Sequence, residues 1–334
     1  MDSITQAVLG AAVAGAVAGR QCNGKVLAAG AMLGTLPDLD VFIDYGTDLA
    51  NTVNHRGFSH SLFVLLPFSL LLSWLLRCNA KLAEYWPFKK LFTLVALALI
   101  THPLLDSFTT YGTHLFWPLD RPSVMISSIF IIDLFYTVPL IIAVIWAKFS
   151  QHKAVACRWG LAVSSAYLVW TVVAQQLIII RVEHQLADTE LAGRPLLVTP
   201  TPFNSLLWRA LVLGDNTYWE GTSSFLDQDG YIRFVQYDRG LPPAQARFPT
   251  LAVFDRFAHG FVSYQLEGEY FKATDLRLGM AESNPFAFYL AEYSQGQWRE
   301  ITPVTVPRHV AVTEVLPRLW QRMLGDQTIP PSLN

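Results

Sequence analysis

Residues 54–76 read NHRGFSHSLFVLLPFSLLLSWLL, so two histidines and an arginine stand directly before a long apolar run. Such a run predicts a membrane helix, although about 20 helical residues are needed to cross a bilayer core of about 30 Å. Ionisable side chains at membrane depth are costly and tend to be functional. The stretch therefore predicts a polar site at the mouth of a membrane helix.

The composition of the whole chain is that of a membrane protein. Of its 334 residues, 52% are hydrophobic and only 15% are charged, and the mean hydropathy is +0.32. An ordinary soluble domain carries about 25% charged residues. The formal net charge of -2 and the lack of a basic tract argue against nucleic-acid binding. The three cysteines are widely spaced and match neither a disulfide framework nor a zinc motif.

Six apolar stretches are candidate membrane helices, and the last two are the most convincing. They are Ile4–Gly19, Val26–Leu36, Ser61–Leu76, Leu91–Leu105, Val124–Ala147 and Gly160–Val182. Nine lysines and arginines gather on alternate connecting segments, whereas segments 37–60 and 106–123 carry only Arg56 and Arg121. The positive-inside rule then predicts a multi-pass membrane protein with both polar clusters and everything after Val182 on the outer side, which for a bacterium is the periplasm or cell exterior.

The composition changes near Glu183. Alternating stretches such as YIRFVQY (231–237) and FVSYQLEGEYF (261–271) are separated by turn signals, DQDG at 227–230 and SQGQ at 294–297. An amphipathic helix is expected over roughly Val310–Leu324. The predicted fold is therefore an α-helical polytopic membrane domain, residues 1–182, followed by an antiparallel β-rich (α+β) soluble domain, residues 183–334.

Carboxylates and imidazoles recur on the predicted outer side, in LPDLD (36–40), HRGFSH (55–60), HPLLD (102–106) and YGTH (111–114). These groups bind zinc or a similar divalent ion. His102 and Asp106 are four residues apart, so one helix face presents both. His55 and His60 would point about 140° apart on a helix, so they need a loop. Gly57 gives that loop freedom, and Ser59 is a candidate N-cap for the next helix.

Several polar residues have two interpretations. Arg56 either contacts a phosphate or carboxylate of a substrate or pairs with Asp38 or Asp40. Three further residues are candidates for supporting the site or binding the ion. They are Asp2, His114 and Asp133. Asp2 could instead cap the first helix, and His114 could instead lie at the membrane interface without a role in the site. Asp133 is a carboxylate inside a predicted membrane helix.

Five spaced motifs together resemble the YdjM-type family of membrane-bound, metal-dependent hydrolases of bacteria, over roughly residues 1–180. The motifs are MDSITQAVLGAA (1–12), GTLPDLD (34–40), HRGFSHS (55–61), THPLLDSFTTYGT (101–113) and IFIIDLFYTVP (129–139). That family is distantly similar to zinc-dependent phospholipase C and single-strand-specific zinc nucleases, whose HxxxD pair holds metal. The resemblance implies that His102 and Asp106 are ligands, with Asp40, His55 and His60 as the others. The chain departs from many relatives at Gln6, where they have histidine.

We therefore expect a metal-dependent hydrolase, with Zn²⁺ as its cofactor, acting on a phosphoester or a lipid-linked ester such as a phospholipid at the outer face of the membrane. The ion would activate water, Asp38 or Asp40 would take the proton, and Arg56 would offset charge on the transferring group. The alternative is a non-catalytic, metal-stabilised scaffold that presents the C-terminal domain. A structural zinc site has a closed ligand shell, whereas a catalytic site keeps a position open.

Overall fold

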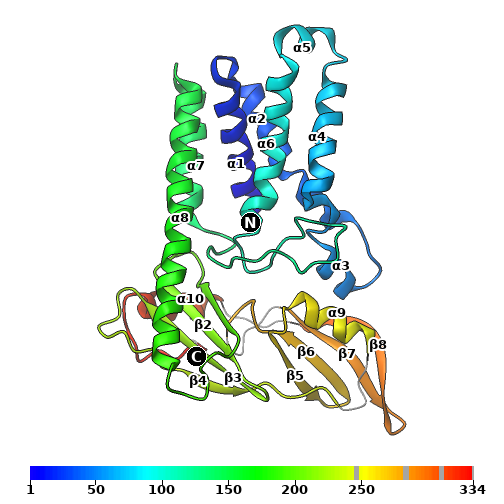
Figure 1. The fold of residues 1–334 in the computed structure, drawn as a ribbon, viewed down its shortest axis with the longest axis vertical. Coiled ribbons are helices and arrows are strands. Elements are labelled where there is room, and N and C mark those ends of the chain that lie inside the picture. Colours follow the sequence, from blue (N-terminus) through cyan, green and yellow to red (C-terminus); the bar gives the residue numbers. More distant parts are fainter. Residues whose placement is uncertain (244–247, 281–285, 308–311, 333–334) are drawn as a thin grey trace. The chain divides into compact units, whose positions relative to one another are not determined.

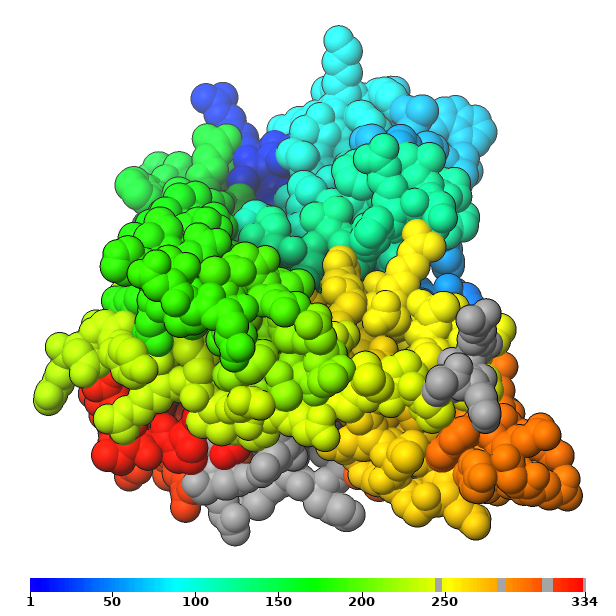
Figure 2. Space-filling model, turned by 60° about the horizontal axis from the view of Figure 1, so that its bottom comes forward, coloured from blue at the N-terminus to red at the C-terminus, as the bar shows by residue number. Residues whose placement is uncertain are grey.

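The computed structural model describes residues 1–243, 248–280, 286–307 and 312–332; the remaining residues are grey in Figures 1 and 2. The chain forms two compact units. The first comprises Met1–Ile43, His55–Val172 and Pro202–Asn204, and the second comprises Asp44–Asn54, Val173–Thr201 and Ser205–Asn334. The division at Val172 falls inside α8, Lys153–Leu186, which continues from the first unit into the second.

The first unit is helical. Its helices are α1 (Ser3–Ala18), α2 (Gly24–Thr35), α4 (Leu62–Leu76), α5 (Ala80–Tyr85), α6 (Phe88–Asp106), α7 (Leu134–Phe149) and the first part of α8, with 3-10 turns η1 (Gly19–Gln21), η2 (Pro37–Phe42) and η3 (Phe58–His60). Helix α1 packs against α2, α6 and α7, and α6 packs against α2 and α4 (Figure 1). Side chains of Asp2, Asn23 and Asp133 accept hydrogen bonds from the free backbone N–H groups that begin α1, α2 and α7.

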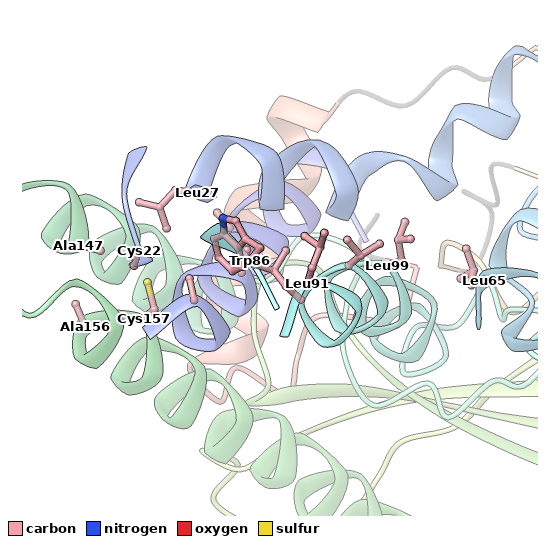
Figure 3. Close-up of a cluster of buried hydrophobic side chains, with 14 residues drawn as sticks. Cys22, Leu27, Leu65, Trp86, Leu91, Leu99, Ala147, Ala156 and Cys157 are labelled. Atoms are coloured by element: carbon pink, nitrogen blue, oxygen red, sulfur yellow. The ribbon is translucent and has the colours of Figure 1, made fainter. Parts of the chain in front are cut away.

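Small residues allow these helices to approach closely. A Cβ atom at Gly10 would lie 2.2 Å from the Gly30 carbonyl oxygen, and one at Gly34 would lie 2.4 Å from the Gln6 carbonyl oxygen. Helices α1 and α2 therefore meet backbone to backbone. The adjoining core buries large apolar side chains such as Leu91 and Leu99 (Figure 3).

Among the described residues, two helices, α6 and α8, are long and apolar enough to cross a membrane, and a third candidate is the bent pair Asp48–His60 and Leu62–Leu76. The expected helix over Val124–Ala147 is wrong for residues 124–133, because α7 begins only at Leu134. Val124 instead forms an antiparallel bridge with Thr113, and the Ile126 N–H donates to the Ser107 carbonyl. The physical reason is the carboxylate of Asp133, which caps the first turn of α7.

The second unit contains two four-stranded antiparallel sheets, each with its strands in chain order. The first sheet has β1 (Leu196–Pro200), β2 (Leu207–Leu213), β3 (Thr217–Ser224) and β4 (Val235–Asp238); the second has β5 (Val262–Glu267), β6 (Tyr270–Asp275), β7 (Ala287–Ser294) and β8 (Gln297–Thr305). Its helices are α3 (Asp48–Asn54), α9 (Pro249–Phe257) and α10 (Val312–Met323). The prediction of an antiparallel β-rich domain is confirmed, as is the C-terminal helix, whose first two expected residues, 310 and 311, lie outside the described residues.

The hairpin between β7 and β8 shows how local sequence determines the register. Ser294 pairs with Gln297, and the two residues between them, Gln295 and Gly296, have φ values of 53° and 79°. Two central residues with positive φ form the type I′ turn that matches the twist of a hairpin. The SQGQ turn signal is therefore confirmed.

Buried charges join the two sheets. Arg209 on β2 pairs with Glu220 on β3 at 2.6 Å, and its Nη1 also donates to the Leu276 carbonyl at 2.7 Å, just beyond β6. Asp275 and Arg277 form a second pair at 2.7 Å, and all four charged side chains are buried. Each of these buried charges is therefore paired, as a buried charge must be to be tolerated.

Candidate metal centre

Four side chains from three elements of the first unit converge on one point. Asp38 comes from η2, His60 from η3, and His102 and Asp106 from the last turns of α6. One nitrogen or oxygen atom from each lies within 4.8 Å of the other three. His60, His102 and Asp106 have fully buried side chains, whereas that of Asp38 is 20% exposed. The group could therefore hold a metal ion, with one donor facing the exterior.

Five distances between donor atoms of the cluster are close to those expected around a tetrahedral ion. The two imidazole Nε2 atoms of His60 and His102 are 3.1 Å apart. Asp38 Oδ1 lies 3.2 Å from His102 Nε2 and 3.4 Å from His60 Nε2, and Asp106 Oδ2 lies 3.4 Å from each of them. Four atoms at about 2.0 Å from a central ion would be about 3.3 Å apart.

The hydrogen-bond partners determine which imidazole nitrogens are free to bind a cation. His102 Nδ1 lies 2.5 Å from the Gly34 carbonyl oxygen, which only accepts, so we assign its proton to Nδ1. Ser59 Oγ donates to Asp40 at 2.7 Å and lies 2.9 Å from His60 Nδ1, so it accepts from that nitrogen. Both Nε2 lone pairs then face the cluster, the arrangement that orients histidine ligands in metalloproteins.

Negative charge accumulates at the same point. Oxygen Oδ2 of Asp106 is buried and has no hydrogen-bond partner among the described residues. Burial opposes ionisation of Asp38, but hydrogen bonds to His102 and His60 hold the pKa of its carboxyl below the ordinary range. Metal ligands bind in their deprotonated forms, so binding of a cation would displace any proton that the cluster holds. Two carboxylates and two imidazole lone pairs thus fit a divalent ion.

Positive and polar groups surround the second face of Asp106. Arg56 Nε lies 3.3 Å from Asp106 Oδ2, and its Nη1 donates to Thr109 at 3.1 Å. Gln6 Nε2 donates to Asp106 Oδ1 at 2.9 Å, and the amino group of Met1 contacts the same oxygen. Arg56 therefore pairs with Asp106, rather than with either of the carboxylates considered from the sequence, and Gln6 supports the cluster through a hydrogen bond.

The structure places Asp40 and His55 beside the cluster rather than within it. His55 Nδ1 lies 2.9 Å from Asp40 Oδ1, and the rings of His55 and His60 are 6.1 Å apart. Burial opposes ionisation of Asp40, but hydrogen bonds from His55 and Ser59 lower the pKa of its carboxyl. Asp38 therefore stands among the four clustered residues, whereas Asp40, the carboxylate expected to be a ligand, lies beside them.

Asp2, His114 and Asp133 lie outside the four-residue group. Asp2 caps α1, as its alternative interpretation predicted, and the His114 N–H donates to the Arg56 carbonyl at 3.1 Å. Asp133 caps α7 and accepts a hydrogen bond from the Tyr167 hydroxyl at 2.8 Å. Asp133 therefore lies directly before α7, whereas the sequence analysis expected it inside the membrane helix.

Ser59 is the site residue that sequence reasoning assigned wrongly. The N-cap of α4 is Ser61, whose Oγ accepts from the Phe63 N–H, whereas Ser59 links Asp40 to His60. The two serines are equally good caps by residue type. The one sequence feature that could have indicated a role for Ser59 in the site is its position directly before His60.

Known proteins resemble this chain over the segment that contains these residues. The model of the family described as "YdjM inner membrane protein" matches residues 1–178, which contain all four clustered residues. The chain is 26% identical over 272 residues to "Uncharacterized protein YfhP" of Bacillus subtilis, covering 79% of this chain and 80% of that protein. It is 36% identical over 96 residues to "Inner membrane protein YbcI" of Escherichia coli, covering 28% of this chain and 52% of that protein.

No solved structure matches the chain, so the more distant similarity to zinc-dependent phospholipase C stays a prediction. The family match covers more than half of the residues, and both its description and that of the Escherichia coli relative name the inner membrane. This chain belongs to the YdjM inner membrane protein family.

Proposed function

We propose that this protein is a membrane-bound, metal-dependent hydrolase that acts on a phosphoester or lipid-linked ester at the outer face of the inner membrane. The observation that carries the proposal is the convergence of Asp38, His60, His102 and Asp106, with three donors buried and Asp38 partly exposed. An exposed edge gives water and substrate access to the ion. Two imidazole nitrogens and two carboxylate oxygens favour Zn²⁺ as the cofactor.

A bound zinc ion supplies an acidified water molecule and polarises a phosphoryl oxygen. We assign the proton acceptor to His55, because Asp40 Oδ1 lies 2.9 Å from its Nδ1 and Nε2 is then the atom left to accept a proton. The side chain of His55 is 27% exposed, so it is more open than the buried donors. Arg56, which is buried and paired with Asp106, would add positive charge close to the ion.

A lipid substrate is favoured by the surface next to the exposed donor. Leu39, Val41 and Phe42 follow Asp38 directly in the chain and are 50%, 66% and 83% exposed. Apolar side chains so exposed suit contact with a bilayer. We further propose a multi-pass topology in which the basic segments are cytoplasmic, so that the C-terminal unit is periplasmic or extracellular.

A non-catalytic scaffold is the second candidate, and one observation favours it. The four donors are by themselves enough to close a tetrahedral shell, as structural zinc sites do. In that case the ion would stabilise the helical unit, and the chain would present its C-terminal sheets without chemistry at the metal.

The experiment compares metal content and hydrolysis in detergent-purified full-length protein. Elemental analysis measures the bound metal in the wild type and in a His102→Ala, Asp106→Ala double variant. Hydrolysis is measured with a panel of phosphoester and phospholipid substrates. A hydrolase predicts that His55→Ala keeps its metal but loses hydrolysis, whereas His152→Ala, a change at an exposed histidine in a basic segment, keeps both. Stoichiometric metal without hydrolysis in the wild type would favour the scaffold, and a wild type that binds no metal would refute both.

A further inference from the structure

Two of the three cysteines lie in one buried cluster of the helical unit. Cys22 follows the short turn η1, and Cys157 lies near the start of α8. Both pack in the core drawn in Figure 3, where Cys157 is fully buried and Cys22 is 6% exposed. Cys78 is exposed and lies elsewhere, after α4. All three are free thiols.

A glycine on α1 creates the space that both sulfurs share. A Cβ atom at Gly15 would lie 2.5 Å from the Cys157 sulfur and 3.3 Å from the Cys22 sulfur. The two sulfurs therefore lie against the same point on α1. Any larger residue at position 15 would force at least the Cys157 side chain to move, since real Cβ contacts are not this short.

The surroundings favour reaction at Cys22. A hydrogen bond with the Cys157 thiol, aided by the charge of Lys153, lowers the pKa of Cys22 to about 7 against the effect of burial. The thiolate is the nucleophilic form of cysteine, so a fraction of Cys22 is reactive near neutral pH.

We propose that Cys22 and Cys157 form a reversible disulfide that ties the end of α1 to the start of α8 when the cell meets a peroxide. The Cys22 thiolate attacks one oxygen of hydrogen peroxide, the O–O bond breaks, and hydroxide leaves and takes up a proton to become water, giving a sulfenic acid. The Cys157 sulfur then attacks the Cys22 sulfur, the S–OH bond breaks, and a second water leaves. Two thiols are oxidised and one peroxide is reduced; a small thiol or dithiol reverses the reaction.

The expected compartment makes the pair a sensor rather than a permanent cross-link. Arg20, Lys25, Lys153 and Arg158 flank the two cysteines, and the positive-inside rule puts such segments in the cytoplasm. Cytoplasmic thiols are kept reduced, so disulfides there form transiently.

The test uses full-length Cys78→Ser protein in detergent, so that only the proposed pair carries thiols. Hydrogen peroxide is added, the protein is denatured, and free thiols are counted with a maleimide; mass spectrometry then searches for linked peptides. We expect both thiols to be lost together, a peptide pair joined through Cys22 and Cys157, and full recovery with dithiothreitol. Persistence of both thiols, or oxidation of Cys22 to sulfinic acid without a link, would overturn the proposal.

A matched variant tests whether the disulfide depends on the packing of Cys22 and Cys157 against Gly15. Gly15→Ala in the same Cys78→Ser protein keeps both thiols but removes the space that they share. We expect the yield of linked peptide to fall, whereas Gly24→Ala, where an added Cβ meets nothing within 4 Å, should leave it unchanged. An equal yield in both variants would contradict the role given to this packing.

Discussion

Replacing Ser59 with alanine tests whether the hydrogen bonds behind the imidazoles determine metal affinity. The hydroxyl of Ser59 donates to Asp40 at 2.7 Å and lies 2.9 Å from His60 Nδ1, so it is the acceptor that holds the His60 ring. Alanine removes that acceptor. The next oxygen, Asp40 Oδ2, is 3.8 Å from His60 Nδ1, which is too far for a hydrogen bond.

The expected magnitude follows from these distances. Loss of a hydrogen bond that orients a metal ligand typically lowers affinity by about 10- to 100-fold. We expect the lower end, about tenfold or about 1.4 kcal/mol, because Asp40 needs only a small movement to reach His60. His60→Ala removes a donor atom itself and should cost more.

The assay is a competition for Zn²⁺ against a chromophoric chelator in detergent solution. The matched control is Ser61→Ala, since Ser61 is also buried but its hydroxyl bonds the Trp117 carbonyl and the Phe63 N–H rather than Asp40 or His60. Its affinity should equal that of the wild type. If Ser59→Ala also binds Zn²⁺ as tightly as the wild type, the assigned protonation of His60 is wrong.

Three further predictions concern stability. Chelation should lower the Tm in differential scanning fluorimetry, because free metal at 100 times its Kd stabilises a fold by about 2.7 kcal/mol; an unchanged Tm would contradict a bound ion. In metal-free protein the pKa of Asp38 is lowered from 3.8, so its stabilising charge is present above pH 3.8 and is lost as the pH falls further. Urea unfolding of the wild type and Asp38→Asn should therefore converge only in strong acid, and convergence near neutrality would refute this. Arg209→Ala should destabilise by about 3–5 kcal/mol, because Glu220 is left buried and unpaired. Arg194→Ala, which breaks an exposed pair, should change the Tm little.

Local patterns in the sequence determined the class of the fold and half of the site. The apolar runs and the alternating stretches after Glu183 predicted helices followed by antiparallel sheets, and the SQGQ signal predicted the β7–β8 turn. His102 and Asp106 were predicted to face one point because four residues make about one helical turn. Each of these inferences depends on residues that are neighbours along the chain.

Only the tertiary structure decided which other residues complete the cluster. Asp38 and Asp40 are two residues apart in a 3-10 turn, so they point about 120° apart, and the path of η2 selects Asp38. Between His55 and His60 the backbone turns at Arg56, where φ is 62°, and this turn brings only His60 among the buried donors. Such choices depend on contacts between distant segments, and no periodicity in the sequence encodes them.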